Sequence, residues 1–151
     1  MPTSTIPLQF KRLDPAAQIP TYAHTGPFGD LAADLYAVVP ATLAPAGHPG
    51  STLLVSTGLA LAFPPGYGAL IEDRSGLAVK GVTSLAGVID PGFRGEIKVV
   101  LTNLNPTPVS IQRGDRIAQL RIVQRLQATF EEVSTLDETP RSVHGFGSTG
   151  I

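Results

Sequence analysis

The chain contains no cysteine, which excludes disulfide bonds, a thiolate nucleophile and cysteine-ligated metal, and fits a reducing compartment. It also lacks any apolar run close to the roughly 20 residues that span a bilayer. The net charge is only −1, so no basic surface for a nucleic-acid backbone is expected. The first residues contain no basic segment followed by an apolar one, and no secretory signal is predicted. These absences predict a soluble cytoplasmic protein that binds neither nucleic acid nor membranes.

The residues that are present predict one β-rich domain. The 151 residues are 42% hydrophobic, and 16 glycines and 14 prolines are spread among them. Such a chain is long enough to bury a core. Short β-branched runs separated by turn signals are typical of an all-β sandwich or barrel. Strands are expected at residues 8–11, 34–38, 51–57, 59–63, 67–71, 109–112 and 116–125, with a short helix at 75–80.

One segment combines a tight turn with a carboxylate and an aromatic ring. Residues 88–89 lead into Asp90-Pro91-Gly92-Phe93, and an apolar strand follows at 96–101. Proline presets φ at the second turn position and glycine accepts a positive φ at the third, so a type II turn is predicted. We therefore expect a rigid β-hairpin with Asp90 and Phe93 at its tip, which suits a small-molecule pocket.

Other segments carry polar residues that suit phosphate. Arg74 and Ser75 precede a glycine where a helix is expected to begin, and a guanidinium and free N–H groups both bind phosphate oxygens. Asp34 lies in an apolar stretch, where a carboxylate is costly unless it is paired or helps to organise a cation. Residues 113–120 fit a turn that enters a strand. Each segment alone also fits an ordinary structural role. The three histidines, His24, His48 and His144, lack the spacing of zinc ligands.

The C-terminal residues differ from the rest of the chain. Residues 140–150 are small, polar and rich in glycine, with one aromatic ring. Such a segment is either a frayed terminus or a flexible arm whose N–H groups, hydroxyls and arginine wrap an anionic ligand.

Taken in order, five segments resemble the five motifs of the trimeric deoxyuridine triphosphatase (dUTPase) family. They are residues 32–37, 74–78, 87–96, 113–120 and 145–150. The resemblance implies a jelly-roll-like β-sandwich with very little helix. It also implies a homotrimer with shared active sites. In such a trimer, residues 1–139 of each chain would form the domain, and residues 140–151 would form an arm that closes over the active site of a neighbouring subunit.

The same resemblance implies an activity. It is the hydrolysis of dUTP to dUMP and pyrophosphate with Mg²⁺, which limits uracil incorporation into DNA and supplies dUMP for thymidylate synthesis. Asp90 would be the general base that activates the water attacking the α-phosphorus. Asp34 would contact Mg²⁺ through water, because the triphosphate holds most of the metal's coordination sphere.

Further substrate-binding residues are implied by the motifs. Those expected at the phosphates are Arg74, Ser75, Gly76 and Gln119. Those whose backbone would read the uracil edge are Gly87, Val88, Ile89 and Lys98. Ser84 would reach the nucleotide, and Phe93 would press against the sugar. Those expected from the arm are Arg141, Phe146, Gly147, Ser148 and Thr149, with the Phe146 ring stacked on the base.

The chain departs from the family pattern at several positions. Phe93 replaces the usual tyrosine, so we expect the shape of the ring to exclude a 2′-hydroxyl without help from a phenol group. Ser142 and His144 stand where the fifth motif usually has glycines, which puts arm closure in question. Glu72 and Asp73 precede Arg74, and two carboxylates beside a triphosphate are unfavourable unless they point away or pair with arginine.

Two alternatives remain. Deoxycytidine triphosphate deaminases share this fold and resemble the third motif, but they place a catalytic glutamate ten residues after the aspartate, where this chain has Val100. The other alternative is a catalytically silent nucleotide-binding or regulatory module on the same scaffold.

Overall fold

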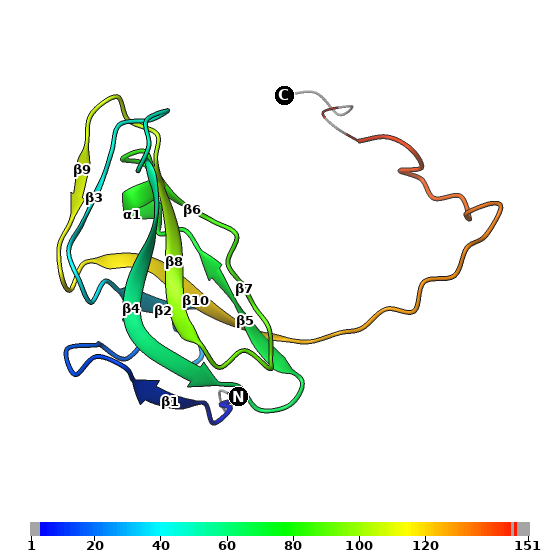
Figure 1. Cartoon of the computed structure of the whole chain (residues 1–151). Coiled ribbons are helices and arrows are strands. Elements are labelled where there is room, and N and C mark those ends of the chain that lie inside the picture. The colour runs from blue at the N-terminus through cyan, green and yellow to red at the C-terminus, as the bar shows by residue number, and fades with distance from the viewer. Residues whose placement is uncertain (1–3, 146, 148–151) are drawn as a thin grey trace.

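The computed structural model describes residues 4–145 and 147 as a β-sandwich followed by an extended C-terminal segment (Figure 1). One antiparallel sheet has the strand order β1-β4-β8-β6, and the other has the order β2-β10-β5-β7. A two-stranded sheet joins β3 and β9. The elements are β1 (Gln9–Arg12), β2 (Ala33–Tyr36), β3 (Ala41–Leu43), β4 (Thr52–Ala62), β5 (Tyr67–Glu72), α1 (Ser75–Ala78), β6 (Val82–Leu85), β7 (Val88–Ile89), β8 (Glu96–Asn103), β9 (Val109–Ile111) and β10 (Arg116–Gln124).

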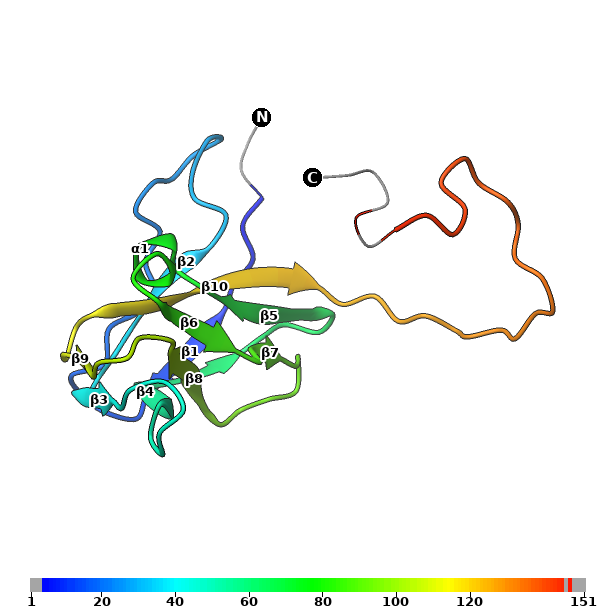
Figure 2. The ribbon, with the colours of Figure 1, turned by 90° about the horizontal axis from the view of Figure 1, so that it is seen from above.

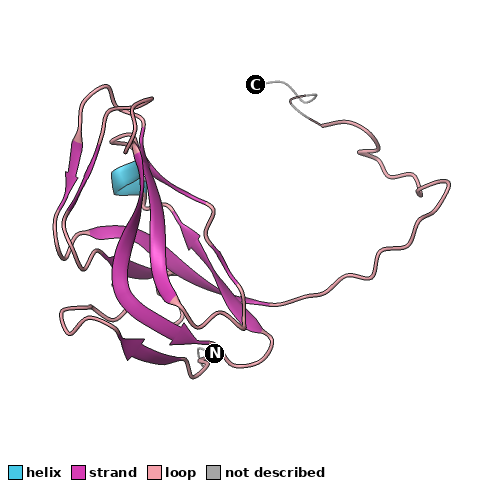
Figure 3. Cartoon of the chain, viewed as in Figure 1, coloured by secondary structure: helices cyan, strands magenta, loops and turns pink. Residues whose placement is uncertain are grey.

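The core lies between the two sheets. Alternate residues of β8 are buried, as expected for a strand with one face on a core. Val55 and Val99 of the first sheet belong to the same buried cluster as Leu35, Ile71 and Leu120 of the second. Figure 3 shows that α1 is a single short turn among strands, which confirms the predicted fold class.

The positions of most strands agree with the prediction, with one fusion and two omissions. The two strands expected at 51–57 and 59–63 form the single strand β4, because Gly58, at φ +71°, lets the chain bulge and continue. The register on β8 shifts at this point, from Ser56 opposite Lys98 to Ala60 opposite Glu96. The sequence reading missed β3 and β6, which are too short to show a clear alternation.

The predicted hairpin at residues 88–101 is wrong in its pairing. β7 pairs with β5 in one sheet, whereas β8 pairs with β4 and β6 in the other, so residues 90–95 cross between the sheets. Gly68 permits the pairing of β7 with β5, because a Cβ there would lie 2.6 Å from the carbonyl oxygen of Ile89. The sequence pattern indicates a strand but does not specify its partner.

The turn itself is present but is not of type II. The Phe93 N–H donates a hydrogen bond of 3.0 Å to the carbonyl oxygen of Asp90. Gly92, however, does not take the positive φ that a type II turn requires. Proline and glycine are compatible with both common turn types, so the dipeptide alone did not decide between them.

The chain leaves the body after β10. The Arg125 N–H still donates to the carbonyl oxygen of Gly66, at 2.7 Å. Residues 126–144 are exposed and extend away from the sandwich in both views (Figures 1 and 2). The extended segment thus begins near residue 126, and the start of the arm at residue 140 stays a prediction. Within residues 4–145 and 147, no helix is long and apolar enough to cross a membrane.

Candidate active site

Three neighbouring strands bring polar residues into one row across the second sheet. Gln119 of β10 lies opposite Asp34 of β2 on one side and opposite Glu72 of β5 on the other. The chain then leaves β5 through Asp73 and enters α1. The first, second and fourth motif-like segments therefore meet at one edge of the fold.

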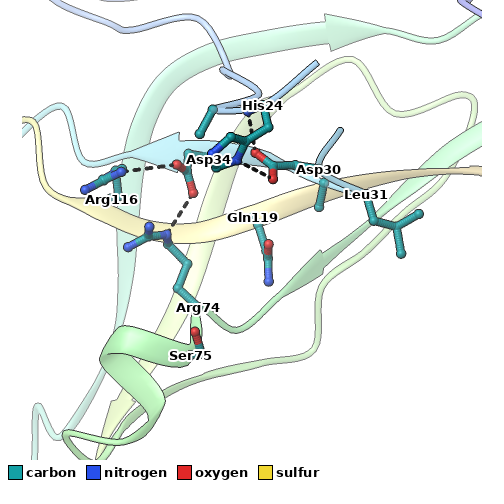
Figure 4. Close-up of a pocket in the computed structure, with 10 residues that line it drawn as sticks. His24, Asp30, Leu31, Asp34, Arg74, Ser75, Arg116 and Gln119 are labelled. Carbon is teal, nitrogen blue, oxygen red and sulfur yellow. Dashed lines mark hydrogen bonds and ion pairs between the residues drawn. The ribbon is translucent and has the colours of Figure 1, made fainter. Parts of the chain in front are cut away.

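An open pocket of about 400 Å³ lies at this edge (Figure 4). Arg74, Ser75, Arg116 and Gln119 line it together with Asp34. The loop before β2 closes another part of the wall with Ala23, His24, Asp30, Leu31 and Ala32. Two arginines, a hydroxyl and an amide are the donors that an anionic ligand needs.

Asp34 holds both arginines of the pocket. Its Oδ1 lies 2.7 Å from Nε of Arg74, and its Oδ2 lies 3.7 Å from Nη1 of Arg116. The side chain of Asp34 is 15% exposed, so this pairing offsets the cost of placing a carboxylate in an apolar stretch. Arg74 pairs with Asp34 through its Nε, and in the part of the chain that the structure describes its Nη hydrogens are available for a ligand.

Ser75 and Gly76 begin α1 and are exposed. Arg74 is the residue before the helix, and its side chain makes no capping hydrogen bond. The first N–H groups of a helix have no partner within it, so this turn offers backbone donors beside the Ser75 hydroxyl. The expected short helix is confirmed, although it ends at Ala78 instead of residue 80.

The carboxylate of Glu72 is paired with an arginine and is not a free negative charge beside the pocket. Arg121 donates to its two carboxylate oxygens at 2.9 and 2.6 Å. These hydrogen bonds, helped by the charge of Arg121, lower the pKa of Glu72. Glu72 therefore meets one of the two conditions that the sequence set for it, pairing with arginine.

Asp73 meets the other condition by pointing toward β6. Its carboxylate accepts hydrogen bonds from the Ser84 N–H at 2.9 Å and from the hydroxyls of Ser84 and Thr83. Partial burial raises the pKa of Asp73, but the hydrogen bonds from Ser84 and Thr83 together outweigh it, and the pKa is lowered. The Ser84 hydroxyl, which the sequence predicts to reach the nucleotide, donates its proton to Asp73 and can still accept a hydrogen bond.

The pocket wall contains a pair of residues that the sequence reading did not connect. His24 Nδ1 lies 3.0 Å from Asp30 Oδ1, and the His24 N–H donates to Asp30 Oδ2 at 2.9 Å. The backbone hydrogen bond from His24, with that of its side chain, lowers the pKa of Asp30. Six residues separate the two in a loop, and no regular pattern links residues at that spacing.

Asp90 and Phe93 lie away from this pocket. Both are exposed in the connection between β7 and β8. Ile89 lies opposite Ala69 near the start of β5, whereas Arg74 follows the end of β5. Since the strands are antiparallel, Asp90 lies beside Gly68, six positions before Arg74, and at about 3.3 Å per strand residue roughly 20 Å separates Asp90 from Arg74. Figure 1 shows the β7–β8 connection and α1 at opposite ends of the sandwich.

The remaining candidates fall into two places. Gly87, Val88 and Ile89 form or adjoin β7, the last strand of its sheet, and Lys98 lies in β8 with Nζ 3.5 Å from Oε2 of Glu96. In the extended segment, Arg141 donates through Nε to the carbonyl oxygen of His144 at 3.1 Å, and Gly147 has φ +86°. Phe146, Ser148 and Thr149 lie outside the described residues.

A β-sandwich that gathers two arginines and a hydroxyl at an open pocket defines a protein that binds a phosphorylated small molecule. A sequence model of the dUTPase family matches residues 17–150. The deoxyuridine 5′-triphosphate nucleotidohydrolase of Thermobifida fusca is 47% identical over 151 residues, which cover 97% of this chain and 80% of the relative. The chain therefore belongs to the dUTPase family, and it hydrolyses dUTP to dUMP and pyrophosphate as a dUTP diphosphatase.

Solved structures agree with this fold. A mutant dUTPase of Staphylococcus bacteriophage 80alpha, solved with dUpNHpp, has a TM-score of 0.80 at 25% identity and covers 97% of this chain and 100% of its own. A mutant dUTPase from phage phi11 of S. aureus has a TM-score of 0.75 at 22% identity, over 86% of this chain and 98% of its own. The second structure is described as showing the coordination of a structural Mg(II) ion.

Proposed function

We propose that each active site for dUTP hydrolysis is completed by separate copies of the chain in a homotrimer. One copy supplies Arg74, Ser75, Gly76 and Gln119, and another supplies Asp90. The observation that carries this proposal is the separation of the two groups at opposite ends of β5. A general base must lie within hydrogen-bond reach of the attacking water. At roughly 20 Å from Arg74, Asp90 of the same chain is too far to direct water onto a phosphate bound there.

The exposed face of the first sheet supports association. Leu54 of β4 and Leu85 of β6 both lie opposite Val100 of β8, which forms an apolar row across this sheet. Leu54 is 66% exposed and Leu85 is 47% exposed. A row of large apolar side chains on an otherwise polar face is typical of a contact with another chain.

The chemistry follows from the donors and the base. Asp90 accepts a proton from a water molecule, and the water oxygen attacks the α-phosphorus in line with the bond to the leaving pyrophosphate. Arg74 places positive charge at the phosphates, while the Ser75 hydroxyl, the nearby N–H groups and the Gln119 amide orient them. The pairing of Arg74 with Asp34 holds the guanidinium in position before substrate binds.

The donor set fits a Mg²⁺ ion that enters with the nucleotide. Among residues 4–145 and 147, no three histidine or carboxylate side chains are grouped to hold a metal ion. Asp34 lies at the pocket with its oxygens directed to arginines, so it would act on the ion through water. Bound Mg²⁺ would offset the negative charge of the triphosphate.

The divergence of β7 and β8 leaves backbone groups free to read a base. β7 is the last strand of its sheet, and within residues 4–145 and 147 only one of its edges is paired. β6 accompanies β8 only from Val100 to Asn103, so in the described structure residues 96–99 have no strand partner on that side. The Gly87 carbonyl oxygen is taken by Ile71, but other backbone groups along these edges, near Gly87, Val88, Ile89 and Lys98, can pair with uracil. Cytosine would leave such groups mispaired and be rejected.

The ring of Phe93 would exclude a 2′-hydroxyl from the sugar by its shape. A Cβ on Gly95 would lie 2.8 Å from the Phe93 ring, so this glycine gives the ring its place over the backbone. The extended segment supports a crossing arm, because residues 126–144 leave the body with their side chains exposed. We propose that Arg141, Phe146, Gly147, Ser148 and Thr149 close over a neighbouring site. A cytoplasmic location suits an enzyme that acts on nucleotide pools.

A nucleotide panel tests the proposed role of Asp90 and the proposed selection of uracil and deoxyribose. Pyrophosphate release would be measured from dUTP, dCTP, dTTP and UTP with Mg²⁺, for the wild type and for Asp90→Asn. We expect release from dUTP alone and its loss in Asp90→Asn, with binding retained. Wild-type protein that binds dUTP tightly without turnover would instead indicate a silent module. Ammonia release from dCTP would indicate a deaminase, against which Val100 argues.

A further inference from the structure

We propose that Asp73 is a positioning residue for phosphate binding, because it ties the turn that carries Arg74 and Ser75 to two neighbouring strands. This inference rests on the proposed function, in which that turn holds the phosphates. Asp73 itself faces away from the pocket and does not line it.

The contacts of Asp73 reach strands on both sides. Its carboxylate accepts three hydrogen bonds from β6, two from hydroxyls and one from the Ser84 N–H. Its carbonyl oxygen accepts a hydrogen bond of 2.6 Å from Nε2 of Gln119 on β10. Residue 73 therefore joins the end of β5 to β6, which belongs to the other sheet, and to β10.

The turn needs this support from outside. α1 has four residues, none of them buried, and its start has no side-chain cap. Such a short helix is not stable by itself. Arg74, in an extended conformation at φ −94° and ψ 130°, is fixed on one side by Asp34 and on the other by the backbone of Asp73. If the Asp73 carboxylate lost its hydrogen bonds to β6, both Arg74 and Ser75 would shift relative to Gln119.

The hydrogen bonds that Asp73 accepts from β6 do not require its negative charge. Glu72 pairs with Arg121 and Arg74 pairs with Asp34, and among the described residues no arginine pairs with Asp73. All three partners are neutral donors, and two of them are hydroxyls that can also accept. An asparagine can accept from Ser84 through Oδ1 and donate to Thr83 through Nδ2. Asp73→Asn should therefore preserve the anchor, whereas Asp73→Ala removes it.

The test is the affinity for dUpNHpp, measured by calorimetric titration, together with kcat and KM for dUTP. We expect Asp73→Ala to weaken dUpNHpp binding by about tenfold or more, since the turn that carries Arg74 and Ser75 loses three hydrogen bonds to β6. Asp73→Asn should remain within about threefold of the wild type. Glu72→Gln is the matched control, because it removes a neighbouring charge without touching β6, and it should leave the affinity unchanged.

A second perturbation approaches the anchor from β6. Thr83→Val deletes one donor, and it should weaken dUpNHpp binding in the wild type but have no further effect in Asp73→Ala, because the two residues act together. If Asp73→Ala fails to fold, Thr83→Val can be combined with Asp73→Asn, and the same comparison of affinities can be made. A merely structural role would lower the urea midpoint of Asp73→Ala and leave the affinity and KM within twofold of the wild type. That result would overturn the proposal.

The outcome is separable from that of the proposed function. If the wild type binds dUpNHpp but does not hydrolyse dUTP, the proposed function fails while the binding comparison still decides the role of Asp73. If the wild type hydrolyses dUTP and Asp73→Asn binds dUpNHpp as weakly as Asp73→Ala, the proposed role of Asp73 is refuted while the proposed function is retained.

Discussion

Gly87→Ala is a sharp test of how β7 meets β5. Gly87 has φ +105°, and its carbonyl oxygen accepts a hydrogen bond of 2.7 Å from the Ile71 N–H. A Cβ at this position would lie 2.4 Å from the carbonyl oxygen of Ile71, closer than any real contact. Since that oxygen belongs to the backbone of a central strand, the two strands must separate to admit the methyl group.

The magnitude follows from three terms. A positive φ costs an L-residue roughly 1–2 kcal/mol. Separation of the strands costs the hydrogen bond from Ile71, about 1 kcal/mol. Replacement of glycine by alanine reduces the entropy of the unfolded chain, which stabilises the folded protein by about 0.4–1 kcal/mol. The free energy of unfolding should therefore fall by about 2 kcal/mol.

Gly92→Ala is the matched control in the adjoining turn. Gly92 has no positive φ, and a Cβ there would meet no atom within 4 Å. Its stability should stay within about 0.5 kcal/mol of the wild type or rise slightly. Both variants would be compared by urea unfolding at one protein concentration, because assembly makes stability depend on concentration. If Gly87→Ala were as stable as Gly92→Ala, the close contact of β7 with β5 would be refuted.

Two further predictions concern the sugar and an ion pair. Phe93→Ala should lower the ratio of dUTP to UTP turnover by roughly tenfold or more, because the ring no longer excludes a 2′-hydroxyl; an unchanged ratio in steady-state assays would show that another group selects the sugar. Glu72→Gln should reduce stability slightly at pH 7, since Arg121 holds the pKa of Glu72 below its ordinary 4.5. The extra stability of the wild type over Glu72→Gln should be fully present above pH 4.5 and should disappear as the pH falls through the pKa of Glu72 in the folded protein. Urea unfolding at several pH values measures this difference in stability. A difference that does not change with pH would show that the ion pair does not contribute.

The sequence was most informative where a local pattern determines structure. Short β-branched runs between turn signals predicted most strands. A carboxylate in the apolar stretch around Asp34 was expected to be paired or to help organise a cation, and it pairs with Arg74. The short helix after Arg74 was also expected, since a glycine and a serine mark its start.

Long-range pairing was less accessible. Nothing near β7 in the sequence shows that β5 is its partner, because that choice depends on the glycines that let the strands approach. The partners of Glu72 and Asp73 were equally hidden. Arg121 follows Glu72 by 49 residues, and Ser84 follows Asp73 by 11, so only the fold brings them together. The family resemblance implied shared active sites, and the register of β5 then showed which residues of one chain lie too far apart to act together.

The shared active site is the central claim, and subunit mixing tests it most directly. Asp90→Asn and Arg74→Ala chains, each inactive alone, would be unfolded together in equal amounts, refolded, and assayed for pyrophosphate release from dUTP. If one chain supplies Arg74 and a neighbour supplies Asp90, about a quarter of the sites in random trimers are intact, and activity should return to about a quarter of the wild-type value. If both residues came from the same chain, every site would carry a defect, and the mixture would remain inactive.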